Sequence, residues 1–203
     1  TLTMRLNTNI EDCYLDFVYT LPADDYMVGM SIQPHNMQLA LAQNMSSVEM
    51  QWNQSIPQQE KGRKFEEKYA QLQYMFIGGE IEKLSEMKSD RANESARLKW
   101  IAYKDQFFST VMIAEDAFES TTMESTPLNQ HSRYIKEYKT TTTLPLDITG
   151  KKNTNLRYYF GPNHYNTLKA YDKDVDKADR LHLNELVPLG WKIVAWINKI
   201  IVI

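Results

Sequence analysis

Apolar and polar residues alternate along the first part of this chain, and a turn interrupts the alternation about every ten residues. Leu2, Met4 and Leu6 lie on one side of the first run, and the stretch from Cys13 to Tyr19 repeats the pattern after an Asn-rich break. Since successive side chains of a strand point to opposite faces, this period is typical of antiparallel strands that bury one face. The 12 tyrosines and a Thr-rich composition favour the same structure. The pattern therefore predicts a mainly β, antiparallel sandwich or barrel.

The rest of the chain continues in strand-like runs separated by polar residues. The charge-dense stretch from Gln58 to Lys68 is interpreted as a solvated loop, and the polar stretch from Glu82 to Glu94 as another loop. Gly78-Gly79 indicates a hairpin turn, whereas Met37 to Ala42 fit either a strand or one helical turn. Further strands are expected at Tyr26 to Gln33, Val48 to Pro57, Tyr69 to Phe76, Leu98 to Ala114 (two central strands), Phe118 to Pro127, Tyr134 to Leu146 and Leu156 to Phe160.

A Gly161-Pro162 turn is expected after the last strand, and a short helical segment follows it. Asn163 is placed to cap a helix from His164 to Tyr171. The aspartates from Asp172 to Asp176 resemble the start of a calcium loop, but Lys177 stands where that loop needs glycine. With their interleaved lysines they are interpreted as a solvated linker.

The last stretch, residues 191–203, is apolar apart from Lys192, Asn198 and Lys199. As a helix it would reach only about 20 Å, which is too short to cross a hydrocarbon layer of about 30 Å. The two lysines fall on one narrow stripe, and apolar residues cover the other sides, so the pattern favours an amphipathic helix in the membrane interface. The residues assigned to this membrane interface are Trp191, Lys192, Ile193, Val194, Trp196, Ile197, Lys199, Ile200 and Ile201.

Two other interpretations of this stretch stay open. A terminal helix could pack on the domain's own sheet, as in a generic protein. Alternatively, the Trp191 side could face the domain while the remainder contacts lipid or neighbouring membrane helices. No apolar run reaches the about 20 residues of a spanning helix and no signal peptide is visible, so the chain is interpreted as a fragment of a longer protein.

Composition and motifs argue against several classes of function. A net charge of -3 gives no basic excess for nucleic acid, and a single cysteine allows no internal disulfide. There is no GxSxG, no phosphate-cradling loop and no metal-ligand spacing among the histidines. The sequence therefore predicts that the chain is not an enzyme and holds neither a cofactor nor a metal. The four histidines are His35, His131, His164 and His182.

Three stretches, in this order and spacing, are similar to the periplasmic domain of YidC-type membrane protein insertases of the Bacteroidetes kind. They are QQEKGRKFEEKYAQLQY (Gln58 to Tyr74), LKWIAYKDQFFSTVMIA (Leu98 to Ala114) and the segment from Tyr158 to Asn198. The third carries YYFGPNHYNTLKA and LNELVPLGWKIVAWIN and is the most specific. The family-motif residues with a structural role are Tyr159, Phe160, Gly161, Pro162, Leu168, Leu186 and Gly190.

The resemblance implies a β-supersandwich, similar to galactose mutarotase, with short C-terminal helices. It divides the chain into a sandwich part at 1–160, a helix and linker at 161–190, and the interfacial helix at 191–203. It also implies that the N-terminal portion of the sandwich, a membrane anchor and the membrane core with its polar, positively charged groove lie outside this chain.

The function implied is accessory and non-catalytic. The parent protein would insert and fold proteins of the bacterial inner membrane, acting as a chaperone in protein transport, and this region would face the periplasm as a docking or scaffold region. Its implied partners are the membrane lipid surface, the Sec translocon with its accessory subunits, and nascent membrane protein clients. No nucleic acid is expected.

Two alternatives come from other classes of protein. One is a carbohydrate-binding or mutarotase-like β-sandwich domain, which would use tryptophans such as Trp52 and Trp100 beside paired carboxylates. Both tryptophans, however, stand in strand-like patterns that more often belong to a core. The other alternative is a generic adhesion or scaffold module.

Overall fold

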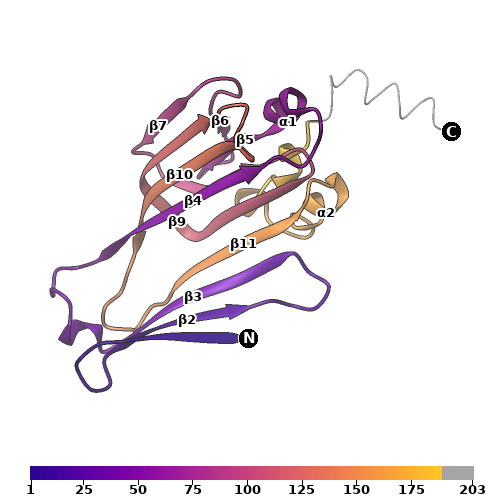
Figure 1. Ribbon diagram of the computed structural model, residues 1–203. Helices are drawn as coiled ribbons and strands as arrows, with labels where there is room; N and C mark the ends of the chain where they lie inside the picture. The colour runs from indigo at the N-terminus through magenta and orange to yellow at the C-terminus, as the bar shows by residue number, and fades with distance from the viewer. Residues whose placement is uncertain (189–203) are drawn as a thin grey trace. The chain divides into compact units, whose positions relative to one another are not determined.

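The computed structural model describes residues 1–188 of the chain (Figure 1). The chain divides into two compact units, one from Thr1 to Pro162 and one that begins at Asn163. The first unit contains every strand of the described residues, and the second contains short helical segments.

Eleven strands pair throughout in antiparallel fashion across residues 1–188, which confirms the mainly β, antiparallel prediction. The strands are β1 (Leu2–Asn7), β2 (Tyr14–Thr20), β3 (Met27–His35), β4 (Ser47–Pro57), β5 (Gln71–Phe76), β6 (Ile81–Lys83), β7 (Asp90–Glu94), β8 (Leu98–Lys104), β9 (Phe108–Pro127), β10 (Tyr134–Pro145) and β11 (Thr154–Pro162). The helical elements are η1 (Met37–Leu39), α1 (Arg63–Tyr69), α2 (Tyr165–Ala170), η2 (Lys177–Asp179) and η3 (Leu183–Leu186).

Strand β9 belongs to two sheets. Its first half pairs with β8 and β11 inside the order β1-β2-β3-β11-β9-β8-β5-β6, and its second half pairs with β10 and β7. The register shifts between the halves, and Ser120 has a φ of 47°, in the left-handed region. An irregularity of this kind bends a strand and increases its twist, so one 20-residue strand can serve both sheets (Figure 1).

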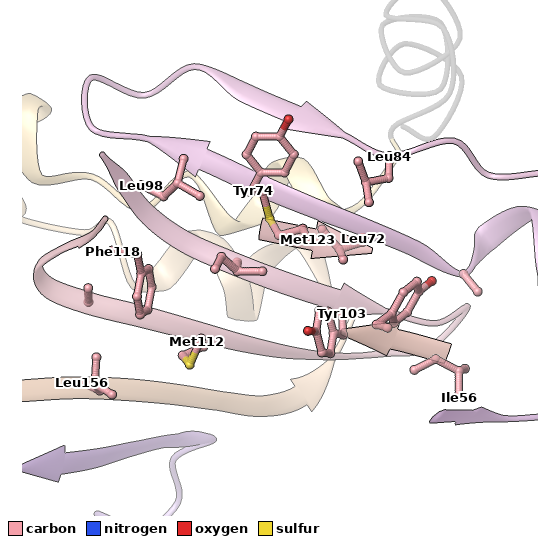
Figure 2. Close-up of a cluster of buried hydrophobic side chains, with 14 of the residues drawn as sticks. Ile56, Leu72, Tyr74, Leu84, Leu98, Tyr103, Met112, Phe118, Met123 and Leu156 are labelled. Atoms are coloured by element: carbon pink, nitrogen blue, oxygen red, sulfur yellow. The ribbon is translucent and has the colours of Figure 1, made fainter. Parts of the chain in front are cut away.

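The main core of the first unit lies between these two sheets. Tyr103 on β8 stacks on the ring of Trp52 on β4 at 3.8 Å and donates its hydroxyl hydrogen to Thr140 Oγ1 on β10 at 2.6 Å. The buried hydroxyl of Tyr103 thus has a hydrogen-bond partner on the other sheet, as buried polar groups generally do. Figure 2 shows the cluster, which includes Ile56, Leu72, Tyr74, Leu84, Leu98, Met112, Phe118, Met123 and Leu156.

Both faces of β8 are buried. Trp100 and Ala102 point to one side and Ile101 and Tyr103 to the other, and all four are almost fully excluded from solvent. Such a strand needs apolar residues at consecutive positions, which is why Leu98 to Ala114 is the densest apolar part of the body. The prediction of two central strands there is confirmed by β8 and the start of β9.

The opening strand departs from the usual one-face burial. Leu2, Met4 and Leu6 share a face of β1, as their spacing predicts, but all three are exposed. Strand β1 is an edge strand whose one neighbour among the described strands is β2. Alternation therefore identified the strand correctly without showing whether its apolar face is covered.

The prediction of a solvated loop from Gln58 to Lys68 is wrong, because α1 begins within it. Glu66 on this helix is only 1% exposed, and its carboxylate accepts hydrogen bonds from the backbone N–H groups of Gln59 and Glu60 at 2.9 and 3.2 Å. Arg63, Glu66 and Glu67 make internal bonds, whereas lysines such as Lys64 and Lys68 are exposed, so charge density alone does not indicate a solvated loop.

Two further predictions are corrected by the sheet, and one alternative left open is decided. Glu82 to Glu94 is not a loop, since it carries the short strands β6 and β7. Phe118 to Pro127 is not a separate strand but the continuation of β9. Met37 to Ala42, left open between strand and helical turn, contains η1. The hairpin turn at Gly78-Gly79 is confirmed, because both glycines have positive φ, at 113° and 96°, between β5 and β6.

Candidate functional site

The family-motif residues at the end of the first unit surround a buried tyrosine. Tyr159 is fully buried on β11, and its hydroxyl donates to the carbonyl oxygen of Pro162 at 2.6 Å. The Tyr26 ring meets it edge-on at a centroid distance of 6.1 Å. Burial, with smaller effects from Tyr26 and Asp25, raises the pKa of Tyr159 to about 12. The phenol is therefore neutral at physiological pH and holds the strand end together.

The predicted Gly161-Pro162 turn is wrong, because both residues continue β11. Gly161 pairs with Ser109, and Pro162 pairs with Phe108. A Cβ atom at position 161 would lie 2.6 Å from the Tyr159 ring and 2.9 Å from the Tyr26 ring. The glycine is explained by this close approach. Its neighbour Phe160 is 52% exposed and stacks parallel to Tyr158 at a centroid distance of 5.9 Å.

The second unit begins with a helix that starts one residue later than predicted. The N-cap of α2 is His164, not Asn163, and no side chain caps the helix. The His164 ring bonds the Thr167 hydroxyl through Nδ1 at 2.8 Å. Leu168 on α2 and Leu186 on η3, two of the motif residues, are almost fully buried.

The aspartate run that follows α2 is not simply a solvated linker. Asp172 accepts hydrogen bonds from the backbone N–H groups of Leu181 and His182 at 2.6 and 2.9 Å, one to each carboxylate oxygen. These bonds close a loop of about ten residues, so η2 and η3 are fixed to the end of α2. Leu181 and Leu183, at the far side of the loop, are buried as a result.

A basic hollow with a volume of about 510 Å³ lies within the second unit. Sequence inspection missed it, because lysines and aspartates alternate along residues 169–180 and the charges cancel in the linear sequence. The one available signal was the four-residue spacing of Lys169 and Lys173, which places both on one side of a helical turn. The side chains that line the basic hollow include Asn166, Lys169, Lys173, Arg180, His182 and Asn184.

The histidines do not form a metal centre in the part of the chain that the structure describes. Across residues 1–188 there is no group of three or more His, Cys, Asp or Glu side chains that could hold a metal ion. Each histidine instead makes a local contact. The His35 ring stacks on Tyr14, the His131 backbone N–H donates to Asn129 Oδ1, His164 contacts Thr167, and His182 lies 3.6 Å from Glu185.

The tryptophans proposed for a sugar site are not available for one. Trp100 is fully buried, and the half-buried Trp52 stacks on the core residue Tyr103. A second hollow, of about 390 Å³, lies beside Asp116 and Lys152, but these two side chains bond each other at 2.7 Å. None of its described lining residues is aromatic. Carbohydrate sites depend on exposed aromatic faces, so the geometry does not favour the carbohydrate alternative.

The predicted membrane-interface residues, 191–203, and the motif residue Gly190 lie outside the described residues. Within residues 1–188, no helix combines the length and hydrophobicity needed to cross a membrane. The interfacial assignment of the tail is therefore still a prediction.

Comparison with known proteins gives a consistent result along the whole chain. A family model described as the YidC periplasmic domain matches residues 1–203. The chain is 47% identical over 203 residues to the membrane protein insertase YidC of Parabacteroides distasonis and 48% identical over 200 residues to that of Azobacteroides pseudotrichonymphae. The corresponding protein of Bacteroides fragilis is 43% identical over 203 residues.

These alignments cover 100%, 98% and 100% of this chain but only 32% of each relative, so the chain spans about a third of their length. The matched family is a non-catalytic domain of an inner-membrane insertase and faces the periplasm, in agreement with the predicted class and location. The resemblance drawn from the three sequence stretches is thus confirmed: the chain belongs to the YidC periplasmic domain family.

Proposed function

We propose that this chain serves as the periplasmic docking and scaffold region of a membrane protein insertase. The observation that carries the proposal is the family match over residues 1–203, together with relatives that are named membrane protein insertases. The parent protein would insert and fold nascent inner-membrane proteins, alone or beside the Sec translocon and its accessory subunits. The chain itself would contribute binding surfaces and no chemistry.

The internal bonding of the first unit supports a scaffold role. Charged groups on α1 and the buried Lys136 on β10 bond backbone carbonyl and N–H groups of neighbouring segments, so loops as well as strands are held in place. Such tethering gives a body that keeps its surface in one arrangement while a partner binds. We infer for this body the galactose-mutarotase-like supersandwich type of fold.

The second part of the proposal concerns residues 191–203, which would lie in the membrane interface. Trp191 and Trp196 belong at the headgroup level, where tryptophan is enriched. Lys192 and Lys199 would reach towards lipid phosphates while the isoleucines enter the acyl boundary. This arrangement would place the β-rich body beside the bilayer without crossing it.

Vesicle flotation tests the membrane contact directly. The chain of residues 1–203 is mixed with phosphatidylcholine vesicles, and the floating fraction is compared with that of a variant carrying Ile197→Glu and Ile201→Glu. Two carboxylates on the apolar side of an interfacial helix oppose its burial, so the variant is expected to lose most of its flotation.

The matched control carries Leu39→Glu and Ile77→Glu, two exposed apolar residues of the first unit. This control adds the same charge and is expected to float like the unaltered chain. Equal flotation of all three proteins, or none by the unaltered chain, would contradict an interfacial role for residues 191–203.

A further inference from the structure

The basic hollow is more positive than the described part of the second unit, residues 163–188, where five acidic side chains outnumber four basic ones. Lys169, Lys173 and Arg180 contribute permanent positive charges to its wall, and Asp172 is the one carboxylate among its described lining residues. The formal surplus is two positive charges before any protonation of His182. The neighbouring aspartates at 174, 176 and 179 do not line it. Folding has therefore separated charges that alternate along the sequence.

The carboxylate of Asp172 is already engaged. Its Oδ1 accepts the N–H of Leu181 at 2.6 Å, and its Oδ2 accepts the N–H of His182 at 2.9 Å. Both oxygens are therefore used to close the loop. An anion in the hollow would meet the cationic side chains and a carboxylate whose oxygens are both bonded to backbone N–H groups.

The cationic groups match the chemistry of phosphate. A guanidinium presents five N–H donors, and Nε of Arg180 donates one of them to the carbonyl oxygen of Val175 at 3.3 Å. Forked N–H donors and ammonium groups are the usual partners of phosphate oxygens. The amides of Asn166 and Asn184 add neutral donors at the wall. A volume of about 510 Å³ suits a small polar group rather than a polymer.

The short stretch of chain between the basic hollow and Trp191 favours the membrane as the source of the phosphate. Trp191, the first residue of the proposed interfacial segment, follows Asn184 by seven positions. Even a fully extended chain of that length spans only about 25 Å. If Trp191 lies at the headgroup level, the basic hollow is within this reach of lipid phosphates. Anionic lipids also concentrate near basic groups at a membrane surface.

We propose that the basic hollow binds the phosphate group of an anionic phospholipid headgroup. The inference rests on the proposed membrane contact of residues 191–203. The hollow would supply the preference for lipid charge, and the tail would supply the apolar contact. Together they would fix how the end of this domain is oriented at the bilayer surface.

The test uses the chain of residues 1–203 with two kinds of vesicle, one of phosphatidylcholine alone and one containing phosphatidylglycerol. The unaltered chain is expected to bind the second kind more tightly. A variant with Lys169→Gln and Arg180→Gln is expected to lose that gain, about fivefold for each cation removed, while its binding to phosphatidylcholine is unchanged. Both side chains are exposed, so the fold should persist, and circular dichroism checks this.

The matched control carries Lys64→Gln and Lys68→Gln, two exposed lysines on α1 of the first unit. It removes the same charge and is expected to keep the tighter binding to vesicles that contain phosphatidylglycerol. An equal loss in control and variant would overturn the proposal in favour of general surface charge. Unchanged phosphatidylglycerol binding in the variant would overturn it too.

A soluble probe separates the two sources of phosphate. Glycerol phosphate is titrated against the same proteins, and the side-chain amide signals of Asn166 and Asn184 are followed by NMR. Weak, saturable changes in the chemical shifts of these amides, absent in the Lys169→Gln, Arg180→Gln variant, would support a phosphate site in the basic hollow. Shifts of this kind without any vesicle binding would identify free phosphate as the ligand and overturn the lipid assignment. The proposed function is tested separately by the Ile197→Glu, Ile201→Glu variant, which is expected to lose binding to vesicles of phosphatidylcholine alone.

Discussion

The rings of Tyr159 and Tyr26 occupy the space that a side chain at position 161 would need. A Gly161→Ala change would force one ring away, weaken the hydroxyl bond to Pro162 and disturb the end of β11. Overpacking of this kind costs about 1–3 kcal/mol, so the free energy of unfolding should fall by that amount in a denaturant titration. Gly29→Ala is the control, since a Cβ there meets its nearest atom, Thr20 O, at 3.7 Å. A similar loss in both variants would contradict this explanation.

Lys136 is a buried charge whose titration should be visible in stability. It is 1% exposed and donates hydrogen bonds to the carbonyl oxygens of Ala70 and Glu86, and burial lowers its pKa from 10.5 to about 8. Between these values the unfolded chain holds a proton that the folded chain has released, so stability from this group rises with pH. Below about pH 8 both states are protonated, and the contribution is flat.

A Lys136→Met variant isolates this effect from the tyrosines and other groups that titrate nearby. The difference in free energy of unfolding, unaltered chain minus variant, should rise by about 2 kcal/mol from pH 7.5 to pH 9.5. Chemical denaturation at a series of pH values measures it. Lys139→Met, on the same strand but exposed, should give a flat difference. A flat difference for Lys136→Met as well would mean that its pKa is not lowered.

Among the elements, α1 shows how a charged stretch becomes part of the interior. Arg63 donates hydrogen bonds to the carbonyl oxygens of Leu128, Ser132 and Tyr134 at 3.0, 2.8 and 2.9 Å, and its side chain is 10% exposed. One guanidinium therefore holds the whole connection between β9 and β10 against the helix. Its fork can reach three acceptors at once, whereas an ammonium is a single point charge.

An Arg63→Gln change should loosen that connection and lower the free energy of unfolding by about 2–4 kcal/mol, because bonds from a charged donor are among the stronger ones. Arg63→Lys should recover only part of the loss. Hydrogen exchange of the amides between residues 128 and 134 should speed up in both variants. Lys64→Gln, an exposed neighbour on the same helix, should change neither quantity, and equal effects there would count against the clamp.

The sequence predicted strands more reliably than it predicted α1, for a physical reason. Strands such as β8 and β10 follow from local alternation and apolar density, which are visible along the chain. The order of a charged helix depends on acceptors distant in sequence, as the Arg63 bonds to the connection at 128–134 illustrate. The same limit hid the basic hollow, because its cations gather only after Asp172 closes its loop.

Considered as a whole, the first unit depends on one strand. Strand β9 contributes to both sheets, and Phe118 is fully buried in the core between them, next to the register shift that redirects the strand. Local alternation cannot reveal such sharing, which is why the sequence indicated two strands where β9 is continuous. The two sheets should therefore unfold in one transition, not in succession.

A Phe118→Ala change tests this coupling. Removing a fully buried ring leaves a cavity and should cost about 3–5 kcal/mol of the free energy of unfolding. The lower stability should appear equally in amides of β10 in one sheet and of β3 in the other when native-state hydrogen exchange is measured, because β9 connects both. Leu2→Ala, at an exposed position of β1, should shift neither set by more than about 0.5 kcal/mol. If only the β10 amides lost protection, the sheets would be separate folding units that share a strand without sharing stability.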